Sequence, residues 1–121
     1  MRVLFLDDDE GRHALFKQAS IGHDVLHVRT AVEAIDAMKR ERFDLAALDH
    51  DLGGRQFVDS DEEETGYQVA KAVETIPEDK WPLRIIVHSY NQEGARRMVA
   101  RLQPLGIPVQ HAPFGTWKLS A

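Results

Sequence analysis

Acidic and histidine residues directly follow three short apolar runs of this sequence. Carboxylate oxygens bind hard cations such as Mg²⁺, and carboxylates and imidazoles move protons at neutral pH. If the three runs are neighbouring strands of one sheet, these side chains meet in one pocket and form a metal site or an acid–base site. The side chains are Asp7 and Asp8 after the run 3–6, Asp49, His50 and Asp51 after the run 44–48, and His88 and Ser89 after the run 84–87.

The chain alternates strand-like and helix-like segments, which is typical of a parallel sheet with helices on its faces. In such a sheet the ligand site lies beyond the carboxyl ends of the strands, where the three polar groups fall. We therefore expect one α/β domain over residues 1–114, followed by a short C-terminal tail over residues 115–121. The predicted strands are 3–6, 25–28, 44–48, 84–87 and 109–111.

Composition limits the range of functions. The net charge is −5, with 20 acidic against 15 basic residues, whereas broad nucleic-acid binding requires a basic surface. The absence of cysteine excludes disulfides, thiolate metal sites and thiol nucleophiles. No apolar run reaches the roughly 20 residues of a membrane-spanning helix, and the N-terminus lacks the pattern of a signal peptide. We expect a cytoplasmic protein, without membrane contact, whose partner is a small phosphate-containing ligand or nucleotide.

Two segments resemble the acidic strand ends of bacterial response-regulator receiver domains. Leu6-Asp7-Asp8-Asp9 is similar to the end of the first receiver strand, and the segment 44–49 is similar to the third, which ends at the phosphoacceptor aspartate. The resemblance extends over about residues 2–114. It implies a receiver-like (flavodoxin-like) doubly wound fold with five parallel strands in the order 2-1-3-4-5.

Three features depart from the receiver pattern. His88 stands where a receiver has Thr or Ser, and the segment 110–114 replaces the Lys-Pro that grips the phosphoryl group. Only eight residues follow Pro113, so the usual fifth helix is lacking. The blocks 48–53 and 88–94 more closely resemble the cyclic-phosphate-processing receiver domains. This resemblance implies an enzyme that acts on cyclic phosphate groups.

Asp7, Asp8 and Asp49 are the predicted metal ligands. Carboxylates gather this closely only where a cation or shared protons relieve their repulsion. Oxygen donors favour Mg²⁺ or Mn²⁺, and a nearby imidazole favours Mn²⁺. Asp51 has the same direction as Asp49 along the strand and completes the predicted set. The alternative is a solvated acidic rim without a metal, and Asp9 is expected to cap the first helix.

His88, Asp49 and His50 are the predicted catalytic residues. The imidazole of His88 can serve as general acid or base for a phosphoester, and neighbouring carboxylates favour its protonated form. The alternative is a polar core histidine satisfied by Asp49 or by the backbone. Strand alternation directs His50 to the opposite side of the sheet from Asp49, where it orients a carboxylate from behind.

Ser89, Asn91 and Arg12 are the predicted substrate-binding residues. Ser89 and Asn91 precede a helix, so at least one of them is expected to cap it, and a helix N-terminus also attracts phosphate. Arg12 either supplies positive charge for the substrate or forms a salt bridge at the surface. The acidic segment 59–64 is either a solvated part of the polar loop 55–65 or a mobile lid.

Three functions are compatible with these residues. The first is a metal-dependent phosphodiesterase that opens a cyclic phosphate on a nucleotide or an RNA end, with His88 moving a proton. The alternative is a non-catalytic pseudo-receiver that binds a ligand or a protein partner. The third is a receiver phosphorylated on Asp49, which the missing lysine and hydroxyl disfavour.

The lack of a fifth helix predicts an uncovered apolar face on the sheet. We expect Phe114, Trp117 and Leu119 to pack back onto that face. Alternatively, a second subunit covers it in a homodimer.

Overall fold

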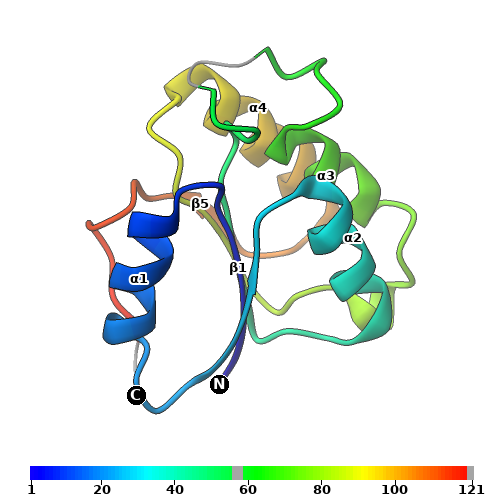
Figure 1. Ribbon diagram of the computed structural model, residues 1–121. Helices are drawn as coiled ribbons and strands as arrows, with labels where there is room; N and C mark the ends of the chain where they lie inside the picture. The colour runs from blue at the N-terminus through cyan, green and yellow to red at the C-terminus, as the bar shows by residue number, and fades with distance from the viewer. Residues whose placement is uncertain (56–58, 120–121) are drawn as a thin grey trace.

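The computed structural model describes residues 1–55 and 59–119; residues 56–58 of the predicted polar loop and 120–121 of the predicted tail lie outside the described residues. In the described part of the chain, five parallel strands form one sheet in the order β2-β1-β3-β4-β5 (Figure 1). The predicted fold class and strand order are confirmed. The strands are β1 (Arg2–Leu6), β2 (Asp24–Val28), β3 (Leu45–Leu48), β4 (Ile85–Val87) and β5 (Val109–His111).

Helices cover both faces of the sheet (Figure 1). The first helix, α1, lies on one face together with the C-terminal segment, and the other three α-helices lie on the opposite face. Asp9 caps α1 by accepting a hydrogen bond from the Arg12 N–H, as predicted. The helices are α1 (Glu10–Ala19), α2 (Ala31–Arg40), α3 (Gly66–Val73) and α4 (Gln92–Leu102), with short 3₁₀ helices η1 (Glu78–Lys80) and η2 (Gln103–Leu105).

Within residues 1–55 and 59–119, no helix is both long and apolar enough to cross a membrane. The longest described helix, α4, has 11 residues, whereas a membrane span needs roughly 20.

Side chains alternate between the two faces of the sheet, because successive residues of a strand point in opposite directions. Leu4 and Leu6 of β1 belong to the larger core under α2, α3 and α4, whereas Val3 and Phe5 belong to the smaller core beside α1. The same alternation continues into the residues that follow each strand. It therefore decides which face their polar side chains reach.

The C-terminal segment covers the sheet beside α1. Phe114, Trp117 and Leu119 pack against the smaller core, and the rings of Phe16 and Trp117 have their centroids 5.7 Å apart. After β5 the described residues contain no further helix. The tail therefore packs onto the sheet as predicted, while the homodimer stays a prediction.

Helix α3 begins directly against the end of β3. A Cβ atom at Gly66 would lie 1.8 Å from the carbonyl oxygen of Asp49, so only glycine fits at this position. The Gly66 N–H donates to the carbonyl oxygen of His50 at 2.9 Å. This close contact fixes the backbone from which the side chains of Asp49 and His50 project.

Candidate active site

The ends of three neighbouring strands bring predicted site residues to one face of the sheet. Strands β1, β3 and β4 are adjacent, and the alternation that places Phe5 and Ala47 beside α1 directs Asp7 and Asp49 the same way. His88 lies on this face too, since its ring stacks on Phe5 with the centroids 5.0 Å apart. Side chains that are distant along the chain therefore lie close together.

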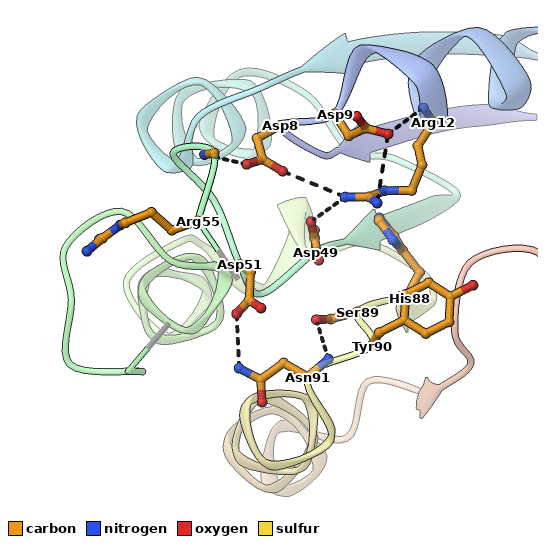
Figure 2. Close-up of a pocket in the computed structure, with 11 residues that line it drawn as sticks. Asp8, Asp9, Arg12, Asp49, Asp51, Arg55, His88, Ser89, Tyr90 and Asn91 are labelled. Atoms are coloured by element: carbon orange, nitrogen blue, oxygen red, sulfur yellow. Dashed lines mark hydrogen bonds and ion pairs between the residues drawn. The ribbon is translucent and has the colours of Figure 1, made fainter. Parts of the chain in front are cut away.

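Three carboxylates form a compact cluster here, which we call the acidic group: Asp7, Asp8 and Asp49. Each offers one oxygen, and these oxygens lie within 4.8 Å of one another. Asp7 and Asp49 are buried, and Asp8 is half-buried. The site opens into a pocket of about 460 Å³ (Figure 2), a volume in the range of small-molecule sites. Arg12, Arg55, His88, Ser89, Tyr90 and Asn91 are among the other residues of its wall.

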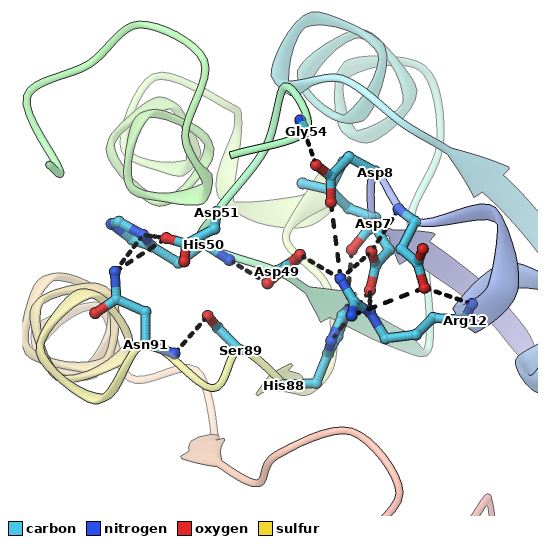
Figure 3. A network of polar contacts seen from close by, with 12 residues as sticks. Asp7, Asp8, Arg12, Asp49, His50, Asp51, Gly54, His88, Ser89 and Asn91 are labelled. Atoms are coloured by element: carbon cyan, nitrogen blue, oxygen red, sulfur yellow. Dashed lines mark hydrogen bonds and ion pairs between the residues drawn. The ribbon is translucent and has the colours of Figure 1, made fainter. Parts of the chain in front are cut away.

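A glycine turn holds Asp8 in place. The backbone N–H of Gly54 donates to Asp8 Oδ2 at 2.6 Å (Figure 3). Gly53 and Gly54 have φ angles of 74° and 77°, a conformation that favours glycine. Burial raises the pKa of the Asp8 carboxyl, although the Gly54 hydrogen bond opposes the shift. The contact from Gly54 to Asp8 was not predicted, because sequence does not show where an N–H points.

Asp49 has one satisfied and one unsatisfied carboxylate oxygen. Oδ1 accepts a hydrogen bond from the His50 N–H at 2.9 Å, whereas Oδ2 is buried without a hydrogen-bond partner among the described residues. Burial, reinforced by the charge of Asp7, raises the pKa of Asp49 to about 8. At neutral pH the metal-free carboxyl therefore holds a proton. A divalent cation at Oδ2 would satisfy this oxygen and replace the proton.

Arg12 lies against the acidic group, with its guanidinium turned into the site (Figure 3). Its Nε donates to Asp7 Oδ2 at 2.7 Å, and a terminal nitrogen donates to Asp7 Oδ1 at 2.9 Å. The hydrogen bonds to Asp7 raise the pKa of Arg12 above its ordinary value. Arg12 therefore forms a salt bridge, as the alternative predicted, but its partner carboxylate is fully buried and does not lie at the surface.

His88 is buried and neutral. Its Nε2 donates to the carbonyl oxygen of Leu6 at 3.0 Å, which leaves the lone pair on Nδ1, 3.7 Å from Asp7 Oδ2. Burial lowers the pKa of His88 to about 4 and outweighs the charge of Asp7. Asp7 favours the protonated form, as predicted for the neighbouring carboxylates, but burial outweighs this effect. Within the described residues, the cluster of candidate metal ligands contains carboxylates and no imidazole.

His50 points away from the acidic group, and its contacts hold Asp51 (Figure 3). The His50 ring is fully buried, with Nδ1 2.8 Å from Asp51 Oδ1 and Nε2 2.9 Å from Ser60 Oγ. Asn91 Nδ2 donates to the same Asp51 oxygen at 2.9 Å. Asp51 lies at the pocket wall, but it is not part of the cluster of candidate metal ligands. The structure thus separates Asp51 from the other predicted ligands, and it keeps the His50 ring behind the pocket.

Ser89 and Asn91 shape the start of α4 at the pocket. Asn91 Oδ1 accepts a hydrogen bond from the Gly94 N–H at 2.9 Å and so caps the helix, as predicted for one of the two residues. Ser89 Oγ accepts from the Asn91 N–H at 3.0 Å. Their contact with substrate stays a prediction. Tyr90 also lines this wall and was not predicted, because it carries no metal-binding or acid–base signal near pH 7.

Gly94 allows α4 to pack on the His50 ring. A Cβ atom at this position would lie 2.5 Å from the Cγ of His50. We expect Gly94→Ala to lower the free energy of unfolding by about 1–3 kcal/mol, although alanine is the better helix former. Urea unfolding of G94A, H50A and the double variant measures this effect. The cost of G94A should largely vanish in the H50A background; an equal cost in both backgrounds would show that this contact is not its cause.

A model of the cyclic-phosphate processing receiver domain family matches residues 2–104. The chain belongs to this family. The resemblance of its strand ends to receiver domains is thereby confirmed. No curated protein matches the receiver domain in sequence.

Solved structures similar to this receiver domain include receiver domains of response regulators and of a sensor histidine kinase. A CheY-like domain from Methylobacillus flagellatus has a TM-score of 0.69 at 15% identity, covering 95% of this chain and 86% of that one. The receiver domain of a sensor histidine kinase from Pseudomonas aeruginosa PAO1, solved with a magnesium ion in its active-site cleft, has a TM-score of 0.67 at 18% identity, covering 97% and 86%. At these identities the likeness establishes the receiver fold alone.

The acidic group of this receiver domain fits Mg²⁺. Its donors are carboxylate oxygens, which hard cations prefer. The oxygens lie within 4.8 Å of one another, and they would move closer together around an ion with bonds of about 2.1 Å. Oδ2 of Asp49 has no hydrogen-bond partner among the described residues, so it can accept a bond to the ion once the carboxyl ionises. Among the described residues no imidazole belongs to the group, so the donor set gives no reason to prefer Mn²⁺ over Mg²⁺.

Proposed function

We propose that this receiver domain is a magnesium-dependent phosphodiesterase that opens the cyclic phosphate of a small nucleotide or of an RNA end. The observation that carries the proposal is the buried Oδ2 of Asp49 within the acidic group, which has no hydrogen-bond partner among the described residues. The family name, which refers to the processing of cyclic phosphates, supports it. The pocket of about 460 Å³ suits a nucleotide-sized ligand, and the net charge of −5 disfavours binding along a polyanion.

The acidic group and His88 have separate parts in the proposed reaction. Mg²⁺ held by the acidic group would polarise the phosphoryl group and lower the pKa of a nearby water. His88 accepts the proton of the attacking water at Nδ1, because its Nε2 is committed to the carbonyl oxygen of Leu6. Asp7, 3.7 Å away, stabilises the imidazolium that forms. The water oxygen bonds to phosphorus and the P–O bond of the ring breaks. The leaving alkoxide takes a proton from solvent and His88 returns its proton to solvent, which yields a phosphomonoester.

The proposal is tested by hydrolysis of cyclic mononucleotides and of an RNA oligonucleotide with a cyclic phosphate end, followed by ³¹P NMR. We expect conversion to the monoester in Mg²⁺ and none in EDTA. Binding of nucleotide without product would instead support the pseudo-receiver alternative. Phosphorylation of Asp49 by acetyl phosphate, without hydrolysis, would support a phosphoaccepting receiver.

Replacing His88 with Phe is expected to lower kcat by about 10²–10⁴-fold, because the proton acceptor is lost. The stack on Phe5 is retained, since a phenyl ring has a similar shape. Affinity for Mg²⁺, measured by calorimetry, should stay unchanged, because His88 does not belong to the acidic group. Turnover within about twofold of the parent protein would identify His88 as a core histidine without a role in proton transfer.

A further inference from the structure

The guanidinium of Arg12 lies against the acidic group, beside the carboxylates that would attract a metal ion (Figure 3). Both oxygens of Asp7 accept hydrogen bonds from Arg12, at 2.7 and 2.9 Å. The nitrogen that contacts Asp7 Oδ1 also lies 3.6 Å from Asp49 Oδ2 and 3.8 Å from Asp8 Oδ1. One guanidinium therefore faces all three carboxylates of the acidic group.

A metal ion and Arg12 compete for the same oxygens. Both oxygens of Asp7 already accept hydrogen bonds, Oδ2 from Arg12 and Oδ1 from Arg12 and the Asp9 N–H. Mg²⁺ at either oxygen would place a double positive charge beside the guanidinium. The ion pair in its present form is bidentate, which is the strongest geometry for arginine and a carboxylate. Binding of the metal must therefore weaken or break a contact that the metal-free protein makes.

The Arg12 side chain can move into the pocket once it is released from Asp7. Arg12 belongs to the wall of the pocket, and its side chain is 32% exposed. Its backbone is fixed, because the Arg12 N–H donates to the cap residue Asp9 in the first turn of α1. Only the side chain has to rotate. The other arginine of the wall, Arg55, pairs with Glu62 at 3.5 Å, so Arg12 is the cation beside the acidic group.

We propose that Arg12 exchanges partners: it neutralises Asp7 while the cation is absent, and it turns to the phosphate oxygens of the ligand once the cation takes its place. The fork of a guanidinium matches two phosphate oxygens as well as two carboxylate oxygens. Metal and phosphate therefore bind cooperatively, with the metal first. The inference rests on the proposed function for the nature of the substrate. The exchange itself concerns only the binding of metal and phosphate and does not require turnover.

Calorimetry tests the exchange in the intact protein, with Mg²⁺ alone, inorganic phosphate alone, and Mg²⁺ in the presence of phosphate. For the parent protein we expect phosphate to raise the affinity for Mg²⁺ by roughly tenfold, and phosphate alone to bind at least about tenfold more weakly than with Mg²⁺. Arg12→Gln is expected to bind Mg²⁺ alone about fivefold more tightly, because the competing cation is gone, and to lose the effect of phosphate. Arg97→Gln, on the exposed side of α4, is the matched control and should behave as the parent protein.

Two further measurements test whether the guanidinium of Arg12 itself changes partner. Arg12→Lys keeps the charge but not the fork, so competition with Mg²⁺ should persist while the effect of phosphate weakens. In the isotope-labelled parent protein, the Nε–H resonance of Arg12 should shift on addition of Mg²⁺ and again on addition of phosphate. Weaker binding of Mg²⁺ to R12Q, unchanged coupling to phosphate, or an unmoved Nε–H resonance would overturn the exchange. Coupled binding without turnover would leave the exchange intact and refute the phosphodiesterase.

Discussion

The metal-free protein is expected to lose about 2 kcal/mol of its free energy of unfolding between pH 6.5 and pH 8, and the D49N variant is expected not to. In the folded protein the pKa of Asp49 is raised from 3.8 to about 8. Between these values the folded state holds a proton that the unfolded chain has lost. The contribution of Asp49 is therefore complete below pH 3.8 and is lost as the pH rises toward 8.

The titration of His88 offsets the loss of free energy of unfolding below pH 6.5, so the loss appears only above that pH. Its folded pKa is lowered from 6.5 to about 4, so its contribution is present above pH 6.5 and is lost as the pH falls toward 4. Between pH 4 and pH 6.5 the contributions of Asp49 and His88 to the free energy of unfolding change with pH in opposite directions and cancel. Above pH 6.5 only the contribution of Asp49 still changes.

Urea unfolding in EDTA over this pH range measures the effect. His88→Phe removes the opposing titration, so its stability should begin to fall near pH 4 instead of near pH 6.5. Saturating Mg²⁺ should remove the loss above pH 6.5 from the parent protein, because the cation replaces the Asp49 proton. Equal slopes for the parent protein and D49N would refute the raised pKa of Asp49.

Replacing Asp49 with Asn is expected to lower the rate of cyclic phosphate hydrolysis at least about 10³-fold. The amide keeps the hydrogen bond that Oδ1 accepts from the His50 N–H, but it cannot ionise to give the negative oxygen that a cation would bind. The fold should therefore persist while Mg²⁺ binding is lost. Single-turnover assays at saturating nucleotide measure the rate.

Asp36→Asn is the matched control for D49N, because it removes an exposed carboxylate of α2 outside the pocket. Its rate should equal that of the parent protein. If D49N retains the parent rate while both proteins bind Mg²⁺ equally, hydrolysis does not depend on the acidic group.

The fold was predictable because the strands leave a clear pattern in the sequence. Each of the runs around Leu4, Ala46 and Ile86 is short, apolar and followed by polar residues, which indicates buried parallel strands that end at a site. Strand alternation then places Asp49 and His50 on opposite faces, and the structure agrees. These properties depend on residue order alone, so sequence suffices to predict them.

The remaining features of the site depend on packing between distant segments. His88 is neutral because it is buried beside Phe5 and bonded to the Leu6 carbonyl, and burial of this kind has no local signal. Arg12 reaches Asp7 through one particular side-chain conformation. The bond from Ser60 to His50 joins a loop to the back of the site. Each of these contacts arises only when the tertiary fold is complete.

Titration of Mg²⁺ by calorimetry into the parent protein, D49N and D36N shows whether the acidic group holds a cation. Near pH 7 we expect one bound Mg²⁺ per chain, with release of nearly one proton as Asp49 ionises, measured in buffers of different ionisation enthalpy. D49N should bind at least about 100-fold more weakly without proton release, and D36N should match the parent protein. Absence of Mg²⁺ binding to the parent protein, or equal affinity in D49N, would contradict the account.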